Sequence, residues 1–394
     1  MMKPLEGCLV LDLTRVLAGP YCTMILGDLG ARVIKIEVPG TGDDSRGYGP
    51  FQNGESAYFM SINRNKQSMT LNLKTEEGRK IFEKLVKQAD VLVENFRPGT
   101  MEKLGYPFEV LKEINRKLVY TTVSGFGHTG PFSQKPAYDI IVQALGGMMS
   151  ITGEEGGTPM KAGASIGDIT AGLFAAIGTL GALSSVSKGS DGQHVDISML
   201  DSQVAILENA ISRYFVGGEV PSPIGNRHPS ITPFCSFPTS NGFIIVAIGN
   251  DSMWKKFCKL LNFEKVSYDS RFLTNADRTN NWKELQRIFE SEFLQKTTED
   301  WLIILEEAGI PSGPIQTINQ VVNHPQVINR NMIIEVEHPE AGVVKMAGNP
   351  IKFSDTAGQD VTHSPLLGQH TEVILKELGY IDDEILAYRK KQII

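Results

Sequence analysis

One carboxylate, Asp168, stands at the start of a long apolar stretch and could carry out covalent chemistry. From 169 to 187 the chain has no charged side chain and alternates small and apolar residues, which is typical of a buried helix. An Asp before such a stretch usually caps the helix, because its side-chain oxygen accepts the free N–H groups of the first turn. The helix N-terminus also favours negative charge, so we expect an ionised carboxylate, which can act as a nucleophile. Position alone favours the cap, and the two roles are compatible.

The elements before Asp168 predict a parallel sheet. Residues 7–37 have the pattern of a strand, a helix and a second strand, and further strands are predicted at 89–94, 118–124 and 194–198. Parallel α/β sheets bind ligands at the carboxyl ends of their strands, so the loops that follow these strands are candidate binding loops. The turn after the first strand lacks the GxGxxG sequence, and the glycine-rich loop 125–130 lacks the GK[ST] ending of a Walker A motif.

The chain is long enough for two domains, and Gly- and Pro-rich segments suggest their limits. We predict an α/β protein with a large domain that begins with residues 1–216. A linker at 217–230 leads to a smaller α/β domain at 231–308. A second linker at 309–330 leads to residues 331–394, which return to the large domain.

Composition restricts the partners. The chain has 394 residues and a net charge of -7, and its basic residues are interspersed with acidic ones, so we expect no nucleic acid partner. The four cysteines form no CxxC pair and have no His at metal-ligand spacing, which favours free thiols in a reducing cytoplasm and no metal site. The stretch 169–187 is rich in Gly, Ser and Thr, which favours a soluble core helix and no membrane. Charges within residues 1–20 argue against a signal peptide.

Taken together, the motifs resemble those of the family III CoA-transferases. The resemblance rests on LDLTRVLAGPYCTMILGDLGARVIKIEVPGTGDDSR, YFMSINRNKQSMTLNLK, ADVLVENFRPG, SGFGHTGP, AYD, GDITAGLFAAIG, GQHVDISMLDSQ, GIPSGPI and PLLGQHT, which extend nearly from end to end. The wording looks most similar to the branch that uses succinyl-CoA and a glutarate-type dicarboxylate, notably in INRNKQS, GNRHPSITPF and MAGNPIKFS.

The resemblance implies an activity and an assembly. It implies that Asp168 is the nucleophile, and that CoA passes from an acyl-CoA to a carboxylic acid through an aspartyl anhydride and an aspartyl-CoA thioester. CoA thioesters are then substrates, and no cofactor is bound permanently. It also implies a Rossmann-like large domain and an interlocked homodimer.

Carried over by position, the resemblance implies a CoA channel. The cations of this channel could instead be solvated surface charges, and its aromatic residues could instead pack in the core. In the segment that replaces a glycine-rich lid of the family, Arg227 and His228 are candidates to bind a second substrate carboxylate, with a solvent-exposed linker charge as the alternative. The channel residues are Leu17, Ala18, Leu71, Lys74, Asn95, Phe96, Arg97, Lys103, Ala137 and Tyr138.

Several alternatives stay open at this stage. Within the family, a formyl- or acetyl-CoA:oxalate-type or a carnitine-type transferase is possible, and Val38 stands where many relatives have an Arg. An α-methylacyl-CoA racemase would need a His just before Asp139, where this chain has Tyr138. A non-catalytic CoA-binding protein predicts that Asp168 can be replaced without effect, and the missing glycine fingerprint argues against a NAD-dependent oxidoreductase.

Overall fold

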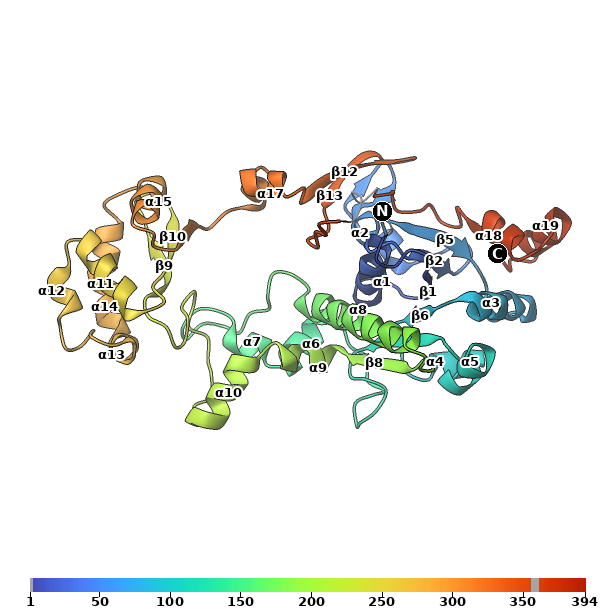
Figure 1. The fold of residues 1–394 in the computed structure, drawn as a ribbon, viewed down its shortest axis with the longest axis horizontal. Helices are drawn as coiled ribbons and strands as arrows, with labels where there is room; N and C mark the ends of the chain where they lie inside the picture. The colour runs from blue at the N-terminus through green and yellow to red at the C-terminus, as the bar shows by residue number, and fades with distance from the viewer. Residues whose placement is uncertain (1–2, 356–360) are drawn as a thin grey trace. The chain divides into compact units, whose positions relative to one another are not determined.

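The computed structural model describes residues 3–355 and 361–394, which form two compact units (Figure 1). The first unit comprises Met1–Met148, Lys161–Gly218 and Gln326–Ile394, and the second comprises Met149–Met160 and Glu219–Pro325. Two unit boundaries fall within residues 217–230 and 309–330, where the sequence is rich in Gly and Pro or follows such a stretch. The short segment Met149–Met160 groups with the second unit although it precedes Asp168 in the chain.

A six-stranded sheet in which every pairing is parallel organises the first unit. The strand order is β5-β2-β1-β6-β7-β8, so the chain builds outward from β1 on one side and then returns to build outward on the other. This is the strand order of the Rossmann fold, and the predicted α/β class with a large parallel sheet is confirmed. The strands are β1 (Leu9–Asp12), β2 (Arg32–Glu37), β5 (Lys66–Thr70), β6 (Val91–Glu94), β7 (Val119–Ser124) and β8 (His194–Ser198).

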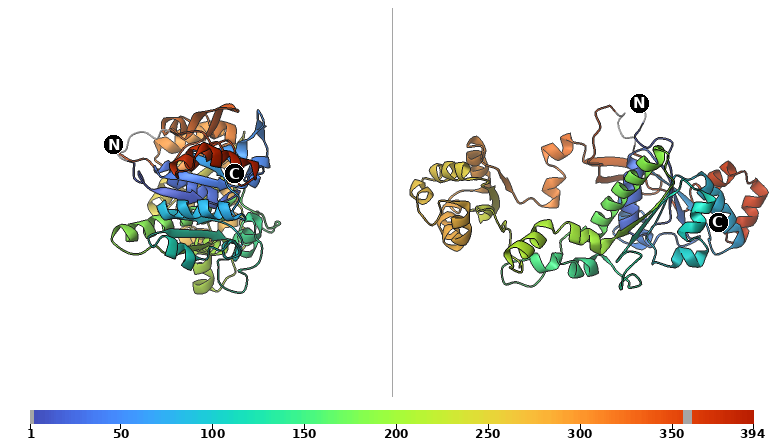
Figure 2. Two further views of the ribbon diagram at one scale, coloured as in Figure 1. Left: turned by 90° about the vertical axis from the view of Figure 1, so that its right-hand side faces the viewer. Right: turned by 60° about the horizontal axis from the view of Figure 1, so that its bottom comes forward.

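Helices cover both faces of this sheet, as the right-hand view of Figure 2 shows. Successive strand residues point to opposite faces, so Val10 packs in one apolar cluster and Leu11 in the other. The first face carries α1 (Ala18–Asp28) and α8 (Ile166–Ser187). The second carries α3 (Glu76–Gln88), α5 (Phe108–Ile114), α18 (Thr371–Glu377) and α19 (Asp382–Lys390).

Small residues let α8 lie close to its neighbours. A Cβ at Gly172 would come within 2.6 Å of the Ala18 carbonyl oxygen, and one at Gly178 within 2.8 Å of Val195. Of the helices in the described residues, α8 alone is long and apolar enough to cross a membrane, a test that core helices of soluble proteins also pass. Eight of its residues are buried in the first unit.

Shorter elements complete the first unit. The hairpins pair β3 with β4 and β12 with β13. These elements are β3 (Phe51–Gln52), β4 (Glu55–Ser56), β12 (Ile333–His338), β13 (Gly342–Ala347), the 3₁₀ turn η1 (Asp44–Gly47), α2 (Ala57–Ile62), α4 (Thr100–Leu104), α6 (Asp139–Leu145), α9 (Met199–Ala205) and α10 (Glu208–Gly217). The chain also forms α7 (Met148–Ile151) and α17 (Pro325–Asn329) where it passes between the units.

The second unit packs helices on a three-stranded antiparallel sheet of order β11-β10-β9. Aromatic side chains dominate its core; Phe237 stacks on Phe293 with ring centroids 4.7 Å apart, and Trp254 lies edge-on to Phe289. Its elements are β9 (Phe234–Pro238), β10 (Phe243–Ala247), β11 (Ser312–Pro314), α11 (Asp251–Leu260), α12 (Glu264–Ser267), α13 (Asn275–Asn280), α14 (Trp282–Phe293), α15 (Thr298–Glu307) and α16 (Ile318–Val321).

Candidate active site

The carboxyl ends of β1 and β6 mark the point where the strand order reverses, which is where open α/β sheets bind ligands. The two loops that leave this point are joined by Asn95. Its side-chain amide donates to the carbonyl oxygen of Arg15 at 2.8 Å, and its amide oxygen accepts the Arg15 N–H at 2.7 Å. The structure therefore brings the predicted residue Asn95 directly against the loop that precedes Leu17 and Ala18.

A buried network of ion pairs supports the β1–α1 loop. Lys66 pairs with Asp12 at 3.0 Å and Lys35 pairs with Asp43 at 2.8 Å, and all four side chains are fully buried. Lys35 also donates to the carbonyl oxygen of Thr14 at 2.7 Å. Burial raises the pKa of Asp12, but Lys35, Lys66 and two threonine hydroxyls outweigh it and lower the pKa to about 2. The four charges neutralise one another within the network. They therefore stabilise the β1–α1 loop and are not available to bind a ligand.

The predicted channel residues differ in exposure. Leu71 follows β5 and is buried in the core cluster on the α3 face, and Phe96 packs partly against the same cluster. Lys74, Arg97 and Lys103 are exposed, and none forms an ion pair with any residue in 3–355 or 361–394. Three cations without an ion pair among the described residues thus lie in the segments that follow β5 and β6.

The other predicted channel residues lie near the loop after β7. Tyr138 precedes α6 and is 76% exposed. Ala137 lies so close to Gly125 that a Cβ on this glycine would come within 2.3 Å of it. The loop after β7 and the start of α6 are therefore packed together.

Asp168 is not the N-cap of its helix. The helix α8 begins at Ile166, and Asp168 is its third residue, whereas the N-cap Ser165 makes no side-chain capping bond. The cap comes instead from α6, because Asp139 accepts the N–H of Gly167 at 2.8 Å. A Cβ at Gly167 would come within 2.7 Å of Val142 on α6, so only glycine allows this approach. The expectation that Asp168 caps the helix was wrong, because a distant carboxylate fills that position.

The environment of Asp168 favours its neutral form. Burial and then the charge of Asp139 raise the pKa of Asp168 to about 7. No hydrogen bond to the Asp168 carboxylate is found within the described part of the chain, whereas Asp139 also accepts from Gln143 at 2.7 Å. The expectation that the helix N-terminus keeps Asp168 fully ionised is therefore corrected, since burial and the neighbouring charge outweigh the helix dipole.

Asp168 lies beside the start of α1. Gly172, one turn further along the same face of α8, approaches the Ala18 carbonyl oxygen. Tyr58 belongs to one apolar cluster with Leu17, and burial and then the Asp168 charge raise the pKa of Tyr58 to about 12. Asp168, Tyr58 and the first residues of α1 therefore gather at one place next to the carboxyl edge of the sheet.

No role was predicted for Tyr58 or Gln143, and Asp139 served only to locate the position of a racemase histidine. The signal for Tyr58 was its place in YFMSINRNK, and that for Asp139 was the AYD motif, whereas Gln143 lies four residues beyond that motif. Neither motif reveals that its polar side chain meets α8, because the contacts join residues far apart in the chain.

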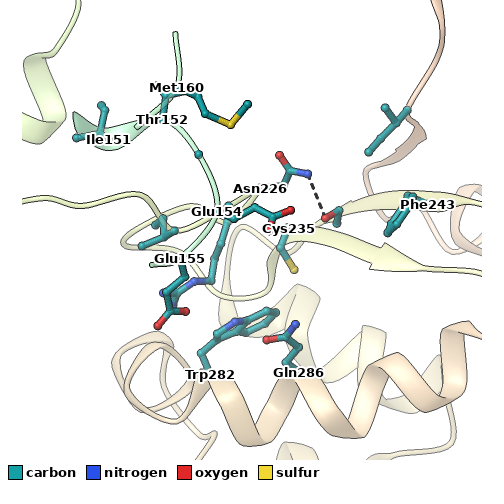
Figure 3. A pocket seen from close by; sticks show the side chains of 16 residues that line it. Ile151, Thr152, Glu154, Glu155, Met160, Asn226, Cys235, Phe243, Trp282 and Gln286 are labelled. Atoms are coloured by element: carbon teal, nitrogen blue, oxygen red, sulfur yellow. Dashed lines mark hydrogen bonds between the residues drawn. The ribbon is translucent and has the colours of Figure 1, made fainter. Parts of the chain in front are cut away.

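Arg227 and His228 belong to the second unit. Arg227 lines a cavity of about 780 Å³, and its guanidinium lies 5.7 Å from the centre of the Trp282 ring. Figure 3 shows that Trp282, Glu154 and Asn226 border the same space. His228 is oriented by the Ser230 N–H, which donates to its Nδ1 at 3.1 Å. This cavity is formed by the second unit alone.

Comparisons with known proteins agree on one family. The family model described as CoA-transferase family III matches residues 5–371. Succinyl-CoA:glutarate CoA-transferase of Homo sapiens is 40% identical over 387 residues, which is 98% of this chain and 88% of the human protein. Acetyl-CoA:oxalate CoA-transferase of Acetobacter aceti is 42% identical and covers 95% of this chain and 96% of its own.

A solved structure of a CAIB/BAIF family protein from Brucella suis has the same fold. Its TM-score to this chain is 0.85 at 39% sequence identity, and the match covers 96% of this chain and 100% of the other.

Proposed function

Because the chain belongs to CoA-transferase family III and is an enzyme of that family, we propose that it transfers CoA from succinyl-CoA to a short dicarboxylic acid, with Asp168 as the nucleophile. The observation that carries this proposal is the Asp168 carboxylate, which has no hydrogen-bond partner among the described residues and has a raised pKa beside the carboxyl edge of the sheet. By contrast, Asp12 and Asp43 are paired with buried lysines, and Asp139 accepts the N–H of Gly167 as the cap of α8.

The names of the relatives support the substrate class. The human and Agrobacterium fabrum relatives act on glutarate, the Acetobacter aceti relative on oxalate and the Haloarcula marismortui relative on mesaconate. All three acceptors are dicarboxylic acids, and three of the four names give succinyl-CoA or succinate as the other substrate. We therefore propose succinyl-CoA as donor and a four- to six-carbon diacid as acceptor.

The reaction then proceeds through Asp168 in two half-reactions. The Asp168 carboxylate attacks the thioester carbonyl of succinyl-CoA, and CoA leaves as its thiolate to give a mixed anhydride. The thiolate attacks the aspartyl carbonyl and expels succinate, which leaves an aspartyl-CoA thioester. An acceptor carboxylate attacks that thioester and forms a second anhydride, and the returning thiolate attacks its acyl carbonyl. The products are the new acyl-CoA and free Asp168, so no ATP is required.

The raised pKa suits this role. A carboxylate with a pKa near 7 is more nucleophilic, once ionised, than one with an ordinary pKa near 4. Partial burial also limits water, which would hydrolyse either intermediate. Tyr58, which is electrostatically coupled to Asp168, keeps its proton at neutral pH and is a candidate donor to the developing oxyanion.

The predicted CoA site fits the exposed cations at the carboxyl edge. CoA carries three phosphates, and Lys74, Arg97 and Lys103 are charged groups with no ion-pair partner among the described residues. We propose that they bind these phosphates, with Leu17, Ala18 and Asn95 shaping the slot at the reversal of strand order.

Recognition of the second carboxylate stays a prediction for Arg227 and His228. Arg46, a further cation of the first unit, already donates to both oxygens of Glu37 at 2.7 and 2.8 Å, which argues against its use by substrate. Glutarate should be a far better acceptor than its monomethyl ester, and Arg227→Ala should reduce this preference. Equal use of diacids and monoacids would contradict the dicarboxylate assignment.

We further propose that the protein is an interlocked homodimer of the cytoplasm. Apolar side chains are exposed in the first unit, including Ile177 on α8 and Phe215 and Val216 on α10, and a second copy would cover them. All four cysteines are free thiols, as a reducing compartment favours. Sizing at nanomolar concentration should give a mass near twice 43.3 kDa. A monomer that appears on dilution would contradict interlocking.

One experiment tests the function and its rivals together. The enzyme is mixed with succinyl-CoA and each of several carboxylic acids, and product thioesters are identified by mass. Hydroxylamine added during turnover should convert the Asp168 side chain to a hydroxamate, detectable in the peptide that contains it. A racemase would instead exchange the α-hydrogen of a 2-methylacyl-CoA with deuterium from solvent, and a non-catalytic binding protein would give neither result.

A further inference from the structure

Two histidines and one aspartate meet at the β8 edge of the six-stranded sheet. His194 is the first residue of β8, and Asp196 lies two positions later on the same face of this strand. His128 comes from the loop after β7, 68 positions before Asp196 in the chain. A ligand atom from each of the three side chains lies within 4.8 Å of the other two. The stretches SGFGHTGP and GQHVDISMLDSQ supply these residues, and the transfer reaction gives them no role.

The surroundings fix the two imidazole rings. The ring of His194 stacks on Tyr120 with centroids 5.0 Å apart, and its Nε2 lies 2.9 Å from the Thr122 hydroxyl. The backbone N–H of His128 donates to Asp196 at 2.9 Å, which holds the loop against β8. The two imidazoles meet edge to face at 5.2 Å. The cluster of His128, His194 and Asp196 is therefore preorganised.

One nitrogen of the cluster lacks a partner. Nε2 of His128 is buried and has no hydrogen-bond partner among the residues that the structure describes. A buried polar nitrogen without a partner is costly, so such groups call for a ligand or a water.

We propose that His128, His194 and Asp196 bind a divalent transition-metal ion such as Zn²⁺. Two imidazoles and a carboxylate are the ligand types that such ions prefer, and a water completes a tetrahedral set. With metal–ligand bonds of about 2.0–2.2 Å, the ligand atoms lie about 3.5 Å apart, so modest side-chain rotation closes the present set. Glu102 and Glu109 act electrostatically on His194 and add negative charge that favours a cation.

The ion would join the loop after β7 to the edge strand β8. This loop leads to Ala137 and Tyr138, and β8 leads directly into α9. The site shares no residue with the Asp168 region, so the ion would stabilise the loop without taking part in CoA transfer. The sequence prediction of no metal site considered only spacing to cysteines, and here the ligands are histidines brought together by the fold.

The test uses the full chain without a histidine tag, stripped of metal by chelation, and titrates it with Zn²⁺ and Co²⁺. Calorimetry should find one saturable equivalent, and Zn²⁺ should raise the melting temperature. His128→Gln, His194→Gln and Asp196→Asn should each weaken binding by about tenfold or more. His228→Gln, in the second unit, is the matched control and should bind as wild type.

Bound Co²⁺ should give a visible spectrum without a charge-transfer band from thiolate, because no cysteine takes part. Absence of a saturable equivalent in the wild-type protein would overturn the proposal whatever the variants do. Binding that all three variants retain, or a thiolate band that places the ion on a cysteine, would overturn it as well. CoA transfer is measured separately, so its loss or retention decides nothing about the metal.

Discussion

Two carboxylates of the first unit, Asp12 and Asp168, lie in opposite electrostatic environments. Below the β1–α1 loop, Asp12 is fully buried and surrounded by Lys35, Lys66 and two threonine hydroxyls, and its pKa falls to about 2. At the start of α8, Asp168 is partly buried, its nearest charge is that of Asp139, and its pKa rises to about 7. The first carboxylate is fully compensated and the second is not.

Whether a charged side chain has a compensating partner distinguishes the charges that stabilise the fold from those that bind or react with a ligand. Substitution of either member of a buried, fully hydrogen-bonded ion pair destabilises the fold, because it leaves an uncompensated charge. An uncompensated carboxylate is unfavourable for folding and is retained where chemistry requires it. The same contrast applies to the cations: Lys35 and Lys66 are paired, whereas Lys74, Arg97 and Lys103 have no ion-pair partner in residues 3–355 and 361–394.

The largest effect is expected from Asp168→Asn, which removes the uncompensated carboxylate. CoA transfer should fall by roughly 10⁴-fold or more, the scale for loss of a nucleophile. CoA should still bind, as calorimetry can measure. Asp201→Asn, which changes an exposed acid in the first turn of α9, is the matched control and should keep full activity. Near-normal turnover of Asp168→Asn would show that the uncompensated carboxylate at the start of α8 is no more catalytic than the paired Asp12.

The same variant should be more stable than wild type at high pH. Because the pKa of Asp168 is raised in the folded state, the folded protein binds more protons than the unfolded chain between about pH 4 and 7. Wild-type stability from this group is therefore lost as the pH rises through about 7. Urea unfolding at pH 5 and pH 8 should show a smaller decline for Asp168→Asn.

A large effect on stability, rather than on chemistry, is expected from Lys66→Met. This change leaves Asp12 with one fewer buried partner, and breaking a buried pair costs about 3–5 kcal/mol of unfolding free energy. Lys80→Met breaks the exposed pair with Glu76 and should not change stability measurably. Equal urea midpoints for the two variants would show that the buried ion pairs below the β1–α1 loop do not stabilise the fold more than an exposed pair does.

The unpaired cations should have smaller effects, and on ligand binding alone. Arg97→Ala should weaken CoA binding by about 1–3 kcal/mol, as expected for loss of a charge-assisted hydrogen bond, and leave the urea midpoint unchanged. Lys74→Ala and Lys103→Ala should behave similarly. Dephospho-CoA identifies the residue that binds the 3′-phosphate, because that variant should no longer distinguish the two ligands. Unchanged CoA affinity in all three variants would make these cations ordinary surface charges.

Much of the architecture could be predicted from the sequence, because it depends on local patterns. The apolar runs at 89–94, 118–124 and 194–198 correspond to β6, β7 and β8. The importance of Asp168 came from resemblance, whereas its environment depends on contacts across the fold. That Asp139 would fill the cap could not be read from the sequence, since the two residues are separated by the segment Met149–Met160 that joins the second unit. The His128 cluster was missed for the same reason.

The smallest effect is expected when the charge beside Asp168 is removed and Asp168 itself is kept. Asp139→Asn retains an oxygen that can accept the Gly167 N–H, but it removes the negative charge that helps to raise the pKa of Asp168. Catalysis requires ionised Asp168, so kcat/KM for succinyl-CoA should rise with pH through about 7 in the wild type. In the variant the pKa of Asp168 falls, so the midpoint of this rise should move to lower pH.

The change in rate at any single pH should be less than about tenfold, because a displacement of one pH unit corresponds to about 1.4 kcal/mol. Titration of the CoA phosphates affects both proteins equally and cancels in the comparison, and Asp201→Asn should reproduce the wild-type profile. Since burial is the larger cause of the raised pKa, the variant should keep part of the elevation. A profile that does not move would mean that burial alone sets the pKa of Asp168, and that Asp139 serves only as the cap of α8.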